Sequence, residues 1–190
     1  MSQFEYLAVL VSVIVGLGVV HLLSGVARLL ADRRRLRPYW VHLLWTWNVF
    51  HYLVYYWWFV WRWSAVSEWQ LVLYLFVLIY AVFLYLLCAV LFPPGEEATD
   101  FREIYLRNKR PFFGLWILIV LVDVVDTRIK QHYGLSGFGP LLVAVWVTLG
   151  LGSAVAARSS SHRLQAGWAM MFFGIMSVFE YLNFRVLRAD

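Results

Sequence analysis

The segment Tyr6–Ala27 (YLAVLVSVIVGLGVVHLLSGVA) runs for 22 residues without an Asp, Glu, Lys or Arg. A transmembrane α-helix needs about 20 mainly apolar residues to cross a hydrocarbon layer roughly 30 Å thick. The segment is therefore long enough to span a bilayer. We do not expect it to be a cleaved signal peptide, because no Lys or Arg precedes Arg28 and such peptides begin with a basic region.

Five further segments along the chain have the length and composition of membrane spans. Together with the first they predict helices over residues 4–30, 38–63, 69–92, 111–129, 138–157 and 164–187. The fourth segment is the weakest in hydropathy because Asp123 and Asp126 interrupt it. Pro38 and Pro111 are placed where a helix tolerates proline, in its first turn. The sequence thus predicts an all-α polytopic membrane protein, a six-helix bundle forming one transmembrane domain over residues 1–190.

The composition agrees with this class. The 190 residues are 63% hydrophobic and 14% charged, whereas about a quarter of an ordinary soluble domain is charged. Nucleic acid is not an expected partner, because the cations behind the net charge of +5 sit in short clusters between apolar runs and form no basic face. Cys88 is the only cysteine, which excludes an intrachain disulfide and a cysteine-based zinc site.

Lys and Arg residues are unevenly distributed between the two sides of the predicted bundle. Eleven belong to the first, third and fifth loops: Arg28, Arg33, Arg34, Arg35, Arg37, Arg102, Arg107, Lys109, Arg110, Arg158 and Arg163. The other five lie on the opposite side: Arg62, Arg128, Lys130, Arg185 and Arg188. The positive-inside rule then places both termini on the non-cytoplasmic side of a plasma membrane. The excess of Arg over Lys favours a bacterial inner membrane.

Short sequence matches suggest an internal repeat. Val49–Leu53 (VFHYL) and Val178–Leu182 (VFEYL) share four of five residues. They are consistent with three pseudo-repeated helical hairpins, an arrangement known in transporters. In that arrangement His51, Asp123 and Glu180 reach a similar depth, roughly 18–24 Å from the cytoplasmic face at 1.5 Å per residue. We also expect the glycine-rich first helix to be central and the uncharged third helix to be peripheral.

Ionisable residues inside membrane spans are costly and therefore mark candidate functional sites. The candidate polar site lies in the outer half of the bundle and comprises Glu5, Asn48, His51, Tyr55, Asp123, Asp126, Glu180 and Asn183. Carboxylates and a histidine at one depth could hold or pass protons or cations. The set His51, Asp123, Asp126 and Glu180 could instead bind a metal ion. A third interpretation is simple ion pairing, since Asp126 and Lys130 are i,i+4 on a helix.

Two histidines, His21 and His42, are candidates in the inner half. Haem is disfavoured, because His42 and His51 fall on opposite helix faces and His21 matches neither in depth. We expect His21 and His42 to form hydrogen bonds with neighbouring helices. No cofactor other than a metal ion is expected.

Three functions therefore remain open from the sequence. The first is transport or conduction of protons or cations through the outer polar site. The second is an intramembrane metal-dependent enzyme that uses the same carboxylates and histidine, although no nucleophilic motif is present and a non-enzymatic function is favoured. The third is a non-catalytic assembly or signalling subunit. The expected partners are the lipid bilayer and further copies of the chain, which the small residues on helix faces such as Gly150–Ser153 could bring together.

Overall fold

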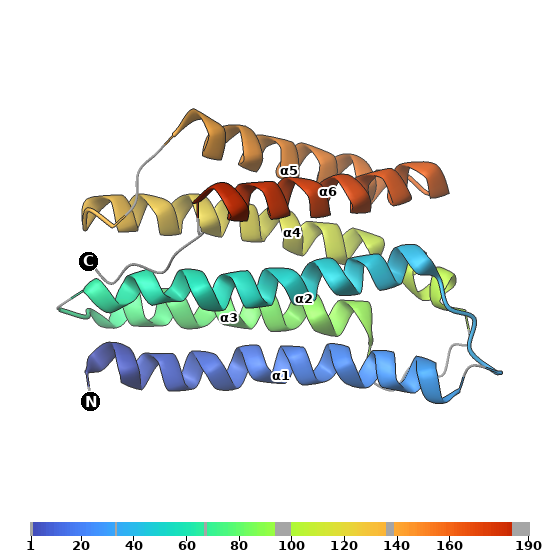
Figure 1. Ribbon diagram of the computed structural model, residues 1–190, viewed down its shortest axis with the longest axis horizontal. Helices are drawn as coiled ribbons and strands as arrows, with labels where there is room; N and C mark the ends of the chain where they lie inside the picture. The colour runs from blue at the N-terminus through green and yellow to red at the C-terminus, as the bar shows by residue number, and fades with distance from the viewer. Residues whose placement is uncertain (1, 33, 67, 94–99, 136–138, 184–190) are drawn as a thin grey trace.

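Long helices lie side by side and alternate in direction along the chain (Figure 1). The computed structural model describes residues 2–32, 34–66, 68–93, 100–135 and 139–183. Within these residues there are six α-helices and one short 3₁₀ helix. They are α1 (Gln3–Ala31), α2 (Trp40–Val60), η1 (Trp61–Ala65), α3 (Leu71–Leu91), α4 (Phe101–His132), α5 (Pro140–Arg158) and α6 (His162–Asn183). The prediction of an all-helical fold with six long helices is confirmed. The expected helix ends at Phe138 and Leu187 lie outside the described residues.

Local sequence signals account for several helix ends. At the start of α1, the Ser2 hydroxyl accepts a hydrogen bond from the Glu5 backbone N–H and the Glu5 carboxylate accepts one from the Ser2 N–H, which forms a capping box. Pro140 begins α5, where its missing N–H costs no intrahelical hydrogen bond. Glu5 is thus a helix cap at the exposed end of α1.

Helix α4 begins at Phe101, ten residues before the expected start at Pro111, which lies inside the helix. The Asp100 side chain caps this start by accepting a hydrogen bond from the Arg102 backbone N–H at 2.8 Å. Phe101, Ile104 and Tyr105 are buried at the i, i+3, i+4 spacing of an amphipathic helix. Residues 101–110, which we expected to belong to a loop, are therefore part of the helix.

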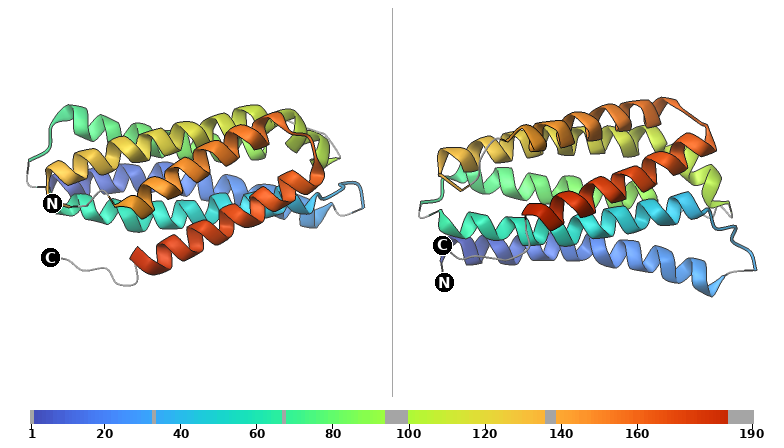
Figure 2. Two further views of the ribbon diagram at one scale, coloured as in Figure 1. Left: turned by 90° about the horizontal axis from the view of Figure 1, so that it is seen from above. Right: turned by 45° about the horizontal axis from the view of Figure 1, so that its top comes forward.

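The positions of the first and third helices are the reverse of what we expected. Helix α3 packs against α1, α2 and α4, whereas α1 packs mainly against α3 at one edge of the bundle (Figures 1 and 2). Gly18 of α1 faces α3, and a Cβ placed there would lie 3.2 Å from Cys88 Sγ. Gly18 therefore serves a close contact between α1 and α3, and the lack of charge in α3 did not imply a peripheral position.

The predicted hairpins are partly reflected in the packing. Helices α3 and α4 pack against each other, but the most extensive contacts join α1 to α3 and α4 to α5, and α6 lies mainly against α2. The internal repeat stays a prediction. Gly152 of α5 faces the Trp168 ring of α6, so this small residue serves packing within the chain.

The core where α2, α4 and α6 meet is aromatic. Trp45 lies with its ring centroid 5.2 Å from Phe112, 5.3 Å from Phe113 and 5.1 Å from Phe172. Trp116 completes the group, 4.6 Å from Phe172. The three contacts of Trp45 are edge-to-face, and such contacts stabilise a core beyond the burial of apolar surface alone. These rings fix the three helices that carry most of the polar residues.

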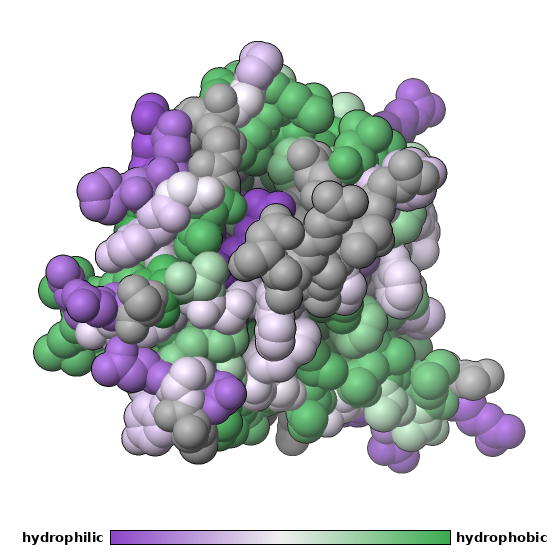
Figure 3. Space-filling view, turned by 60° about the vertical axis from the view of Figure 1, so that its left-hand side comes forward, coloured by the Kyte–Doolittle hydropathy of each residue, from purple (hydrophilic) through white to green (hydrophobic). Residues whose placement is uncertain are grey.

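Apolar side chains also cover much of the outer surface. On α1, Val9, Val13, Leu17 and Val20 are each more than half exposed. Figure 3 shows hydrophilic side chains in separate patches with broad hydrophobic areas between them. Among the residues that the structure describes, three helices, α1, α3 and α5, are long and apolar enough to cross a membrane. Such a surface is typical of a protein embedded in lipid, because soluble monomers rarely expose contiguous apolar patches of this extent.

Candidate functional site

Asp123 of α4 is held by tyrosine hydroxyls from two other helices. The Tyr52 hydroxyl of α2 donates to Asp123 Oδ2 at 2.8 Å, and the Tyr80 hydroxyl of α3 donates to Oδ1 at 2.5 Å. The two tyrosine oxygens lie 2.8 Å from each other. The carboxylate and both hydroxyls thus form a closed ring of three oxygen contacts between three helices.

The number of hydrogens available to this ring is smaller than the number of its oxygen–oxygen contacts. Each tyrosine hydroxyl carries one hydrogen, and an ionised carboxylate carries none. Two hydrogens can occupy only two of the three contacts at once. A third proton, added to Asp123, would allow all three contacts to be hydrogen bonds. The arrangement therefore suits a group that takes up and releases one proton, with the hydroxyls of Tyr52 and Tyr80 rotating to adapt.

Asp126, one turn further along α4, forms a buried ion pair. Its Oδ2 lies 2.9 Å from Lys130 Nζ, and the side chains of both residues are almost fully buried. The predicted i,i+4 pair is confirmed. Trp63 Nε1 donates to Asp126 Oδ1 at 3.2 Å, and Lys130 Nζ lies 3.2 Å from the centroid of the Phe59 ring. Cation–π attraction of this kind strengthens when the cation is removed from water.

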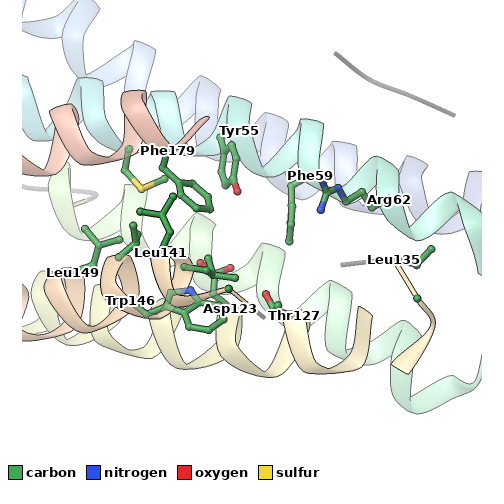
Figure 4. A pocket seen from close by; sticks show the side chains of 15 residues that line it. Tyr55, Phe59, Arg62, Asp123, Thr127, Leu135, Leu141, Trp146, Leu149 and Phe179 are labelled. Carbon is green, nitrogen blue, oxygen red and sulfur yellow. The ribbon is translucent and has the colours of Figure 1, made fainter. Parts of the chain in front are cut away.

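A cavity of about 440 Å³ opens beside Asp123. Its polar walls come from Tyr55, Arg62, Asp123 and Thr127, and α5 and α6 close it with mainly apolar residues. Figure 4 shows Tyr55 and Phe59 pointing from one wall toward Asp123 and Thr127 on the opposite wall. The remaining lining residues are Gly134, Leu135, Gly139, Leu141, Leu142, Val145, Trp146, Leu149, Met176 and Phe179. The cavity therefore combines a few polar groups with a largely apolar surface.

His51 and Glu180 form a separate pair between α2 and α6. His51 Nε2 lies 2.8 Å from Glu180 Oε2, and the two side chains are 25% and 17% exposed. His51 neighbours Tyr52 in the chain, but the two side chains point to different helices, His51 to α6 and Tyr52 to α3 and α4. Asp123 of α4 and Glu180 of α6 thus contact neighbouring residues of α2, but on different faces of that helix.

The other candidates of the outer half have individual places. Asn48 is buried, and its amide donates to the Ala169 carbonyl of α6 at 2.9 Å. Tyr55 lines the cavity and stacks on Phe59. Glu5 caps α1, as described above. The Asn183 side chain lies outside the part of the chain whose side chains the structure describes.

His21 and His42 both bond to the end of α3. His21 Nε2 lies 2.7 Å from the Phe92 carbonyl oxygen, and His42 Nε2 lies 2.8 Å from that of Leu91. Because a carbonyl only accepts, Nε2 is the protonated nitrogen in each ring. The last carbonyls of a helix have no intrahelical partner, and the two histidines supply donors to them. The expected hydrogen bonds to a neighbouring helix are confirmed.

The metal-ligand set predicted from the sequence is not gathered at one point. Among the described residues, no three His, Cys, Asp or Glu side chains lie together as a metal ion would require. His51 pairs with Glu180, Asp126 pairs with Lys130, and Asp123 bonds two tyrosines. The four candidate ligands are therefore divided among three separate sets of contacts.

Sequence reasoning did not select Tyr52, Tyr80 or Trp63. All three are uncharged, so their presence in a span raises no electrostatic cost that would mark them. One signal was available for Tyr52, which directly follows His51. The role of Tyr80 became visible only through the contact of α3 with α4.

Comparison with known protein families, curated proteins and solved structures finds no match to this chain.

Proposed function

We propose that this chain is a six-span plasma-membrane protein, of the bacterial inner-membrane type, that transports or conducts protons or cations through Asp123. The observation that carries the proposal is the ring of Asp123, Tyr52 and Tyr80, with room for one more proton, at the wall of a cavity. An ionisable group at such a place within a membrane bundle is the usual mark of an ion or proton pathway.

The arrangement of the helices supports six crossings. Helices α1, α3 and α5 have the composition of spans, and all three run in the same direction (Figure 1). A chain that crosses three times in one direction must return between crossings, and α2 and α4 are the segments that return. Helix α6 runs beside α2 and would complete the sixth crossing.

Aromatic residues support a membrane interface at the η1 end of the bundle. Trp57, Trp58 and Trp61 are 46%, 39% and 47% exposed near the junction of α2 and η1. Exposed tryptophans gather at membrane interfaces. The Lys and Arg bias would place this end on the non-cytoplasmic side, so that the cavity beside Asp123 would lie in the outer half of the bundle.

A non-catalytic assembly or signalling role is the second candidate. The pairs Asp126–Lys130 and His51–Glu180 favour it, because ionisable side chains that are paired within the chain need no ligand. Asp123 distinguishes the two candidates, since it faces a cavity in addition to its two tyrosines.

The test is proton flux into proteoliposomes that contain the purified protein and a trapped pH-sensitive dye. We expect Asp123→Asn to reduce the proton flux at least tenfold, because a side-chain amide does not take up a proton near neutral pH. Tyr80→Phe should reduce it less, since Tyr52 still holds the carboxylate. Thr148→Val is the control, because this exposed hydroxyl bonds the Ala144 carbonyl of its own helix.

A proton flux that Asp123→Asn leaves unchanged would refute the assignment. The same flux assay run with Na⁺ or K⁺ gradients and no pH gradient separates proton from cation movement. If Asp123→Asn alters only the thermal stability and no flux is seen in the wild type, the non-catalytic role is supported instead.

A further inference from the structure

The cavity beside Asp123 adjoins an apolar groove on the outer surface of the bundle. The groove lies between α5 and α6 and has a volume of about 370 Å³. Leu141, Val145 and Phe179 line both the groove and the cavity. The side chains of these three residues thus form a common wall, where α5 and α6 have diverged from the turn that joins them (Figures 1 and 2).

The groove presents an apolar face to the surroundings of the protein. Small and aliphatic residues such as Ala144, Gly174 and Val178 line it. Thr148 is the one polar side chain among its lining residues, and its hydroxyl bonds to the Ala144 carbonyl of the same helix. A molecule that passes along this groove loses water contacts without gaining hydrogen bonds, so most of its surface must be apolar.

The cavity itself combines a carboxylate with aromatic rings. Tyr55 of α2, Trp146 of α5 and Phe179 of α6 line it together with Asp123 of α4, and Figure 4 shows Tyr55 across the cavity from Asp123. Aromatic faces attract organic cations, and more strongly where water is excluded. The Asp123 oxygens accept two tyrosine hydrogen bonds. An ionised carboxylate has about four acceptor positions, so positions remain for the N–H groups of an ammonium ion.

The charges around Asp123 bear on the sign of the ligand. Arg62 also lines the cavity, but it interacts electrostatically with Asp126, as Lys130 does. These two cations and the carboxylates of Asp123 and Asp126 sum to zero when Asp123 is ionised. A proton on Asp123 adds one positive charge, and an ammonium ion bound to the ionised carboxylate adds the same one. A site built to accept the proton can therefore accept an ammonium ion with no further change in buried charge.

We propose that the cavity binds a lipophilic ammonium ion, which enters from the lipid through the groove between α5 and α6 and replaces the proton on Asp123. The ammonium N–H groups donate to the carboxylate, and the displaced proton is released to water. The apolar or aromatic body of the ligand lies against the side chains of α5 and α6. This inference rests on the proposed role of Asp123 and names the class of cation that it receives.

Four probes test the class of ligand on the purified full chain in phosphatidylcholine nanodiscs, by isothermal titration calorimetry. Three share one apolar body: 4-phenylbutylamine is cationic, 4-phenylbutan-1-ol neutral and 4-phenylbutyrate anionic. Methylamine carries the cation without the body. We expect 4-phenylbutylamine to bind at least about tenfold more tightly than the other three, a difference that titration resolves. Titration of Asp123→Asn in the same nanodiscs measures partition into lipid, and its affinity for the amine should be at least about tenfold lower.

Competition with the proton gives a second measurement. Alkylammonium groups titrate near pH 10, so 4-phenylbutylamine stays charged from about pH 5 to about pH 8. We expect its affinity for the wild type to fall as the pH is lowered through the pKa of Asp123, and Asp123→Asn to abolish this dependence. The asparagine variant retains the other ionisable groups that act on Asp123 from α2, α3 and α4, which are Tyr52, Tyr55, Tyr80, Asp126 and Lys130. Among the described lining residues, α5 and α6 contribute no ionisable group.

Two glycines of α6 test the route of entry. Gly174 lines the groove, whereas Gly167, about two helical turns earlier on the same face, is not among its lining residues. Both have open space around them. An obstacle on a single route slows entry and exit equally, so Gly174→Phe should lower both the association and the dissociation rate several-fold and preserve Kd. Gly167→Phe should leave both rates unchanged. Stopped-flow tryptophan fluorescence measures the rates, and far-UV circular dichroism with a single size-exclusion peak establishes that each variant is folded.

Several results would overturn the inference. Equal binding of the alcohol and the amine would show that charge is not recognised, and tighter binding of 4-phenylbutyrate would identify an anion site. An affinity for the amine that is independent of pH in the wild type would exclude replacement of the proton. Unchanged rates in Gly174→Phe would exclude entry through the groove. Absence of binding by all four probes, with a proton flux that depends on Asp123, would remove the organic ligand and retain the proposed function, which fails only if the flux itself does not depend on Asp123.

Discussion

The buried pair Asp126–Lys130 gives a prediction whose size follows from its geometry. Both side chains are almost completely buried and the charged atoms are 2.9 Å apart. Removing one partner leaves the other charge buried without compensation, which costs about 3–5 kcal/mol. We therefore expect Lys130→Met and Asp126→Asn each to lower the free energy of unfolding by about that amount. The asparagine is chosen because its carbonyl can still accept the hydrogen bond from Trp63 Nε1.

The double variant separates pairing from packing. With both charges gone, no buried charge remains, and replacing a buried ion pair is often neutral. We expect Asp126→Asn/Lys130→Met to lose no more than about 1 kcal/mol, far less than the sum of the single changes. The loss of the Lys130 contact with the Phe59 ring accounts for part of that remainder.

The measurement is unfolding by titration with SDS in mixed micelles, followed by far-UV circular dichroism. Thr148→Val is the control and should change the unfolding free energy by less than about 0.5 kcal/mol. Single variants that each cost less than about 1 kcal/mol would refute the reasoning, because the pair would then be hydrated. A double variant whose loss equals the sum of the single losses would show that the two charges do not interact.

Two further predictions concern packing and topology. Gly152→Ala should lower the thermal midpoint, because the added methyl group would overlap the Trp168 ring and overpacking costs about 1–3 kcal/mol. Gly16 has open space around it, so Gly16→Ala should leave the thermal midpoint unchanged or raise it. Equal effects of the two substitutions on the thermal midpoint would contradict the packing described. In a variant in which alanine replaces the one native cysteine, Ser64→Cys should react with a membrane-impermeant maleimide in intact cells and Ser161→Cys only after lysis. The opposite labelling pattern would reverse the orientation.

Several parts of the structure were predictable from local sequence. The segment from Asp100 to Tyr105 carries an N-cap residue followed by apolar and aromatic residues at helical spacing, so the start of α4 at Phe101 could have been predicted. The i,i+4 pair Asp126–Lys130 follows from helix geometry alone. Glu5 could have been recognised as a cap, because Ser2 precedes it by three residues.

Contacts between helices were much less predictable. The sequence predicted one depth for His51, Asp123 and Glu180, but depth along a helix does not fix rotation about its axis. His51 meets Glu180, whereas Asp123 meets Tyr52 and Tyr80 on other faces. Tyr80 carries no charge, and its helix was expected at the periphery, so nothing in its own segment indicated a polar role.

The sequence by itself determined that the chain is helical and rich in segments able to cross a membrane, as Tyr6–Ala27 shows, because span length and burial of backbone hydrogen bonds are properties of single segments. Tertiary structure alone decided which polar groups meet. The ring of Asp123 with Tyr52 and Tyr80, and the cavity beside it, depend on how α2, α3 and α4 are rotated and packed. Those rotations are set by the combined fit of many side chains, including the aromatic core around Trp45, and no single segment encodes them.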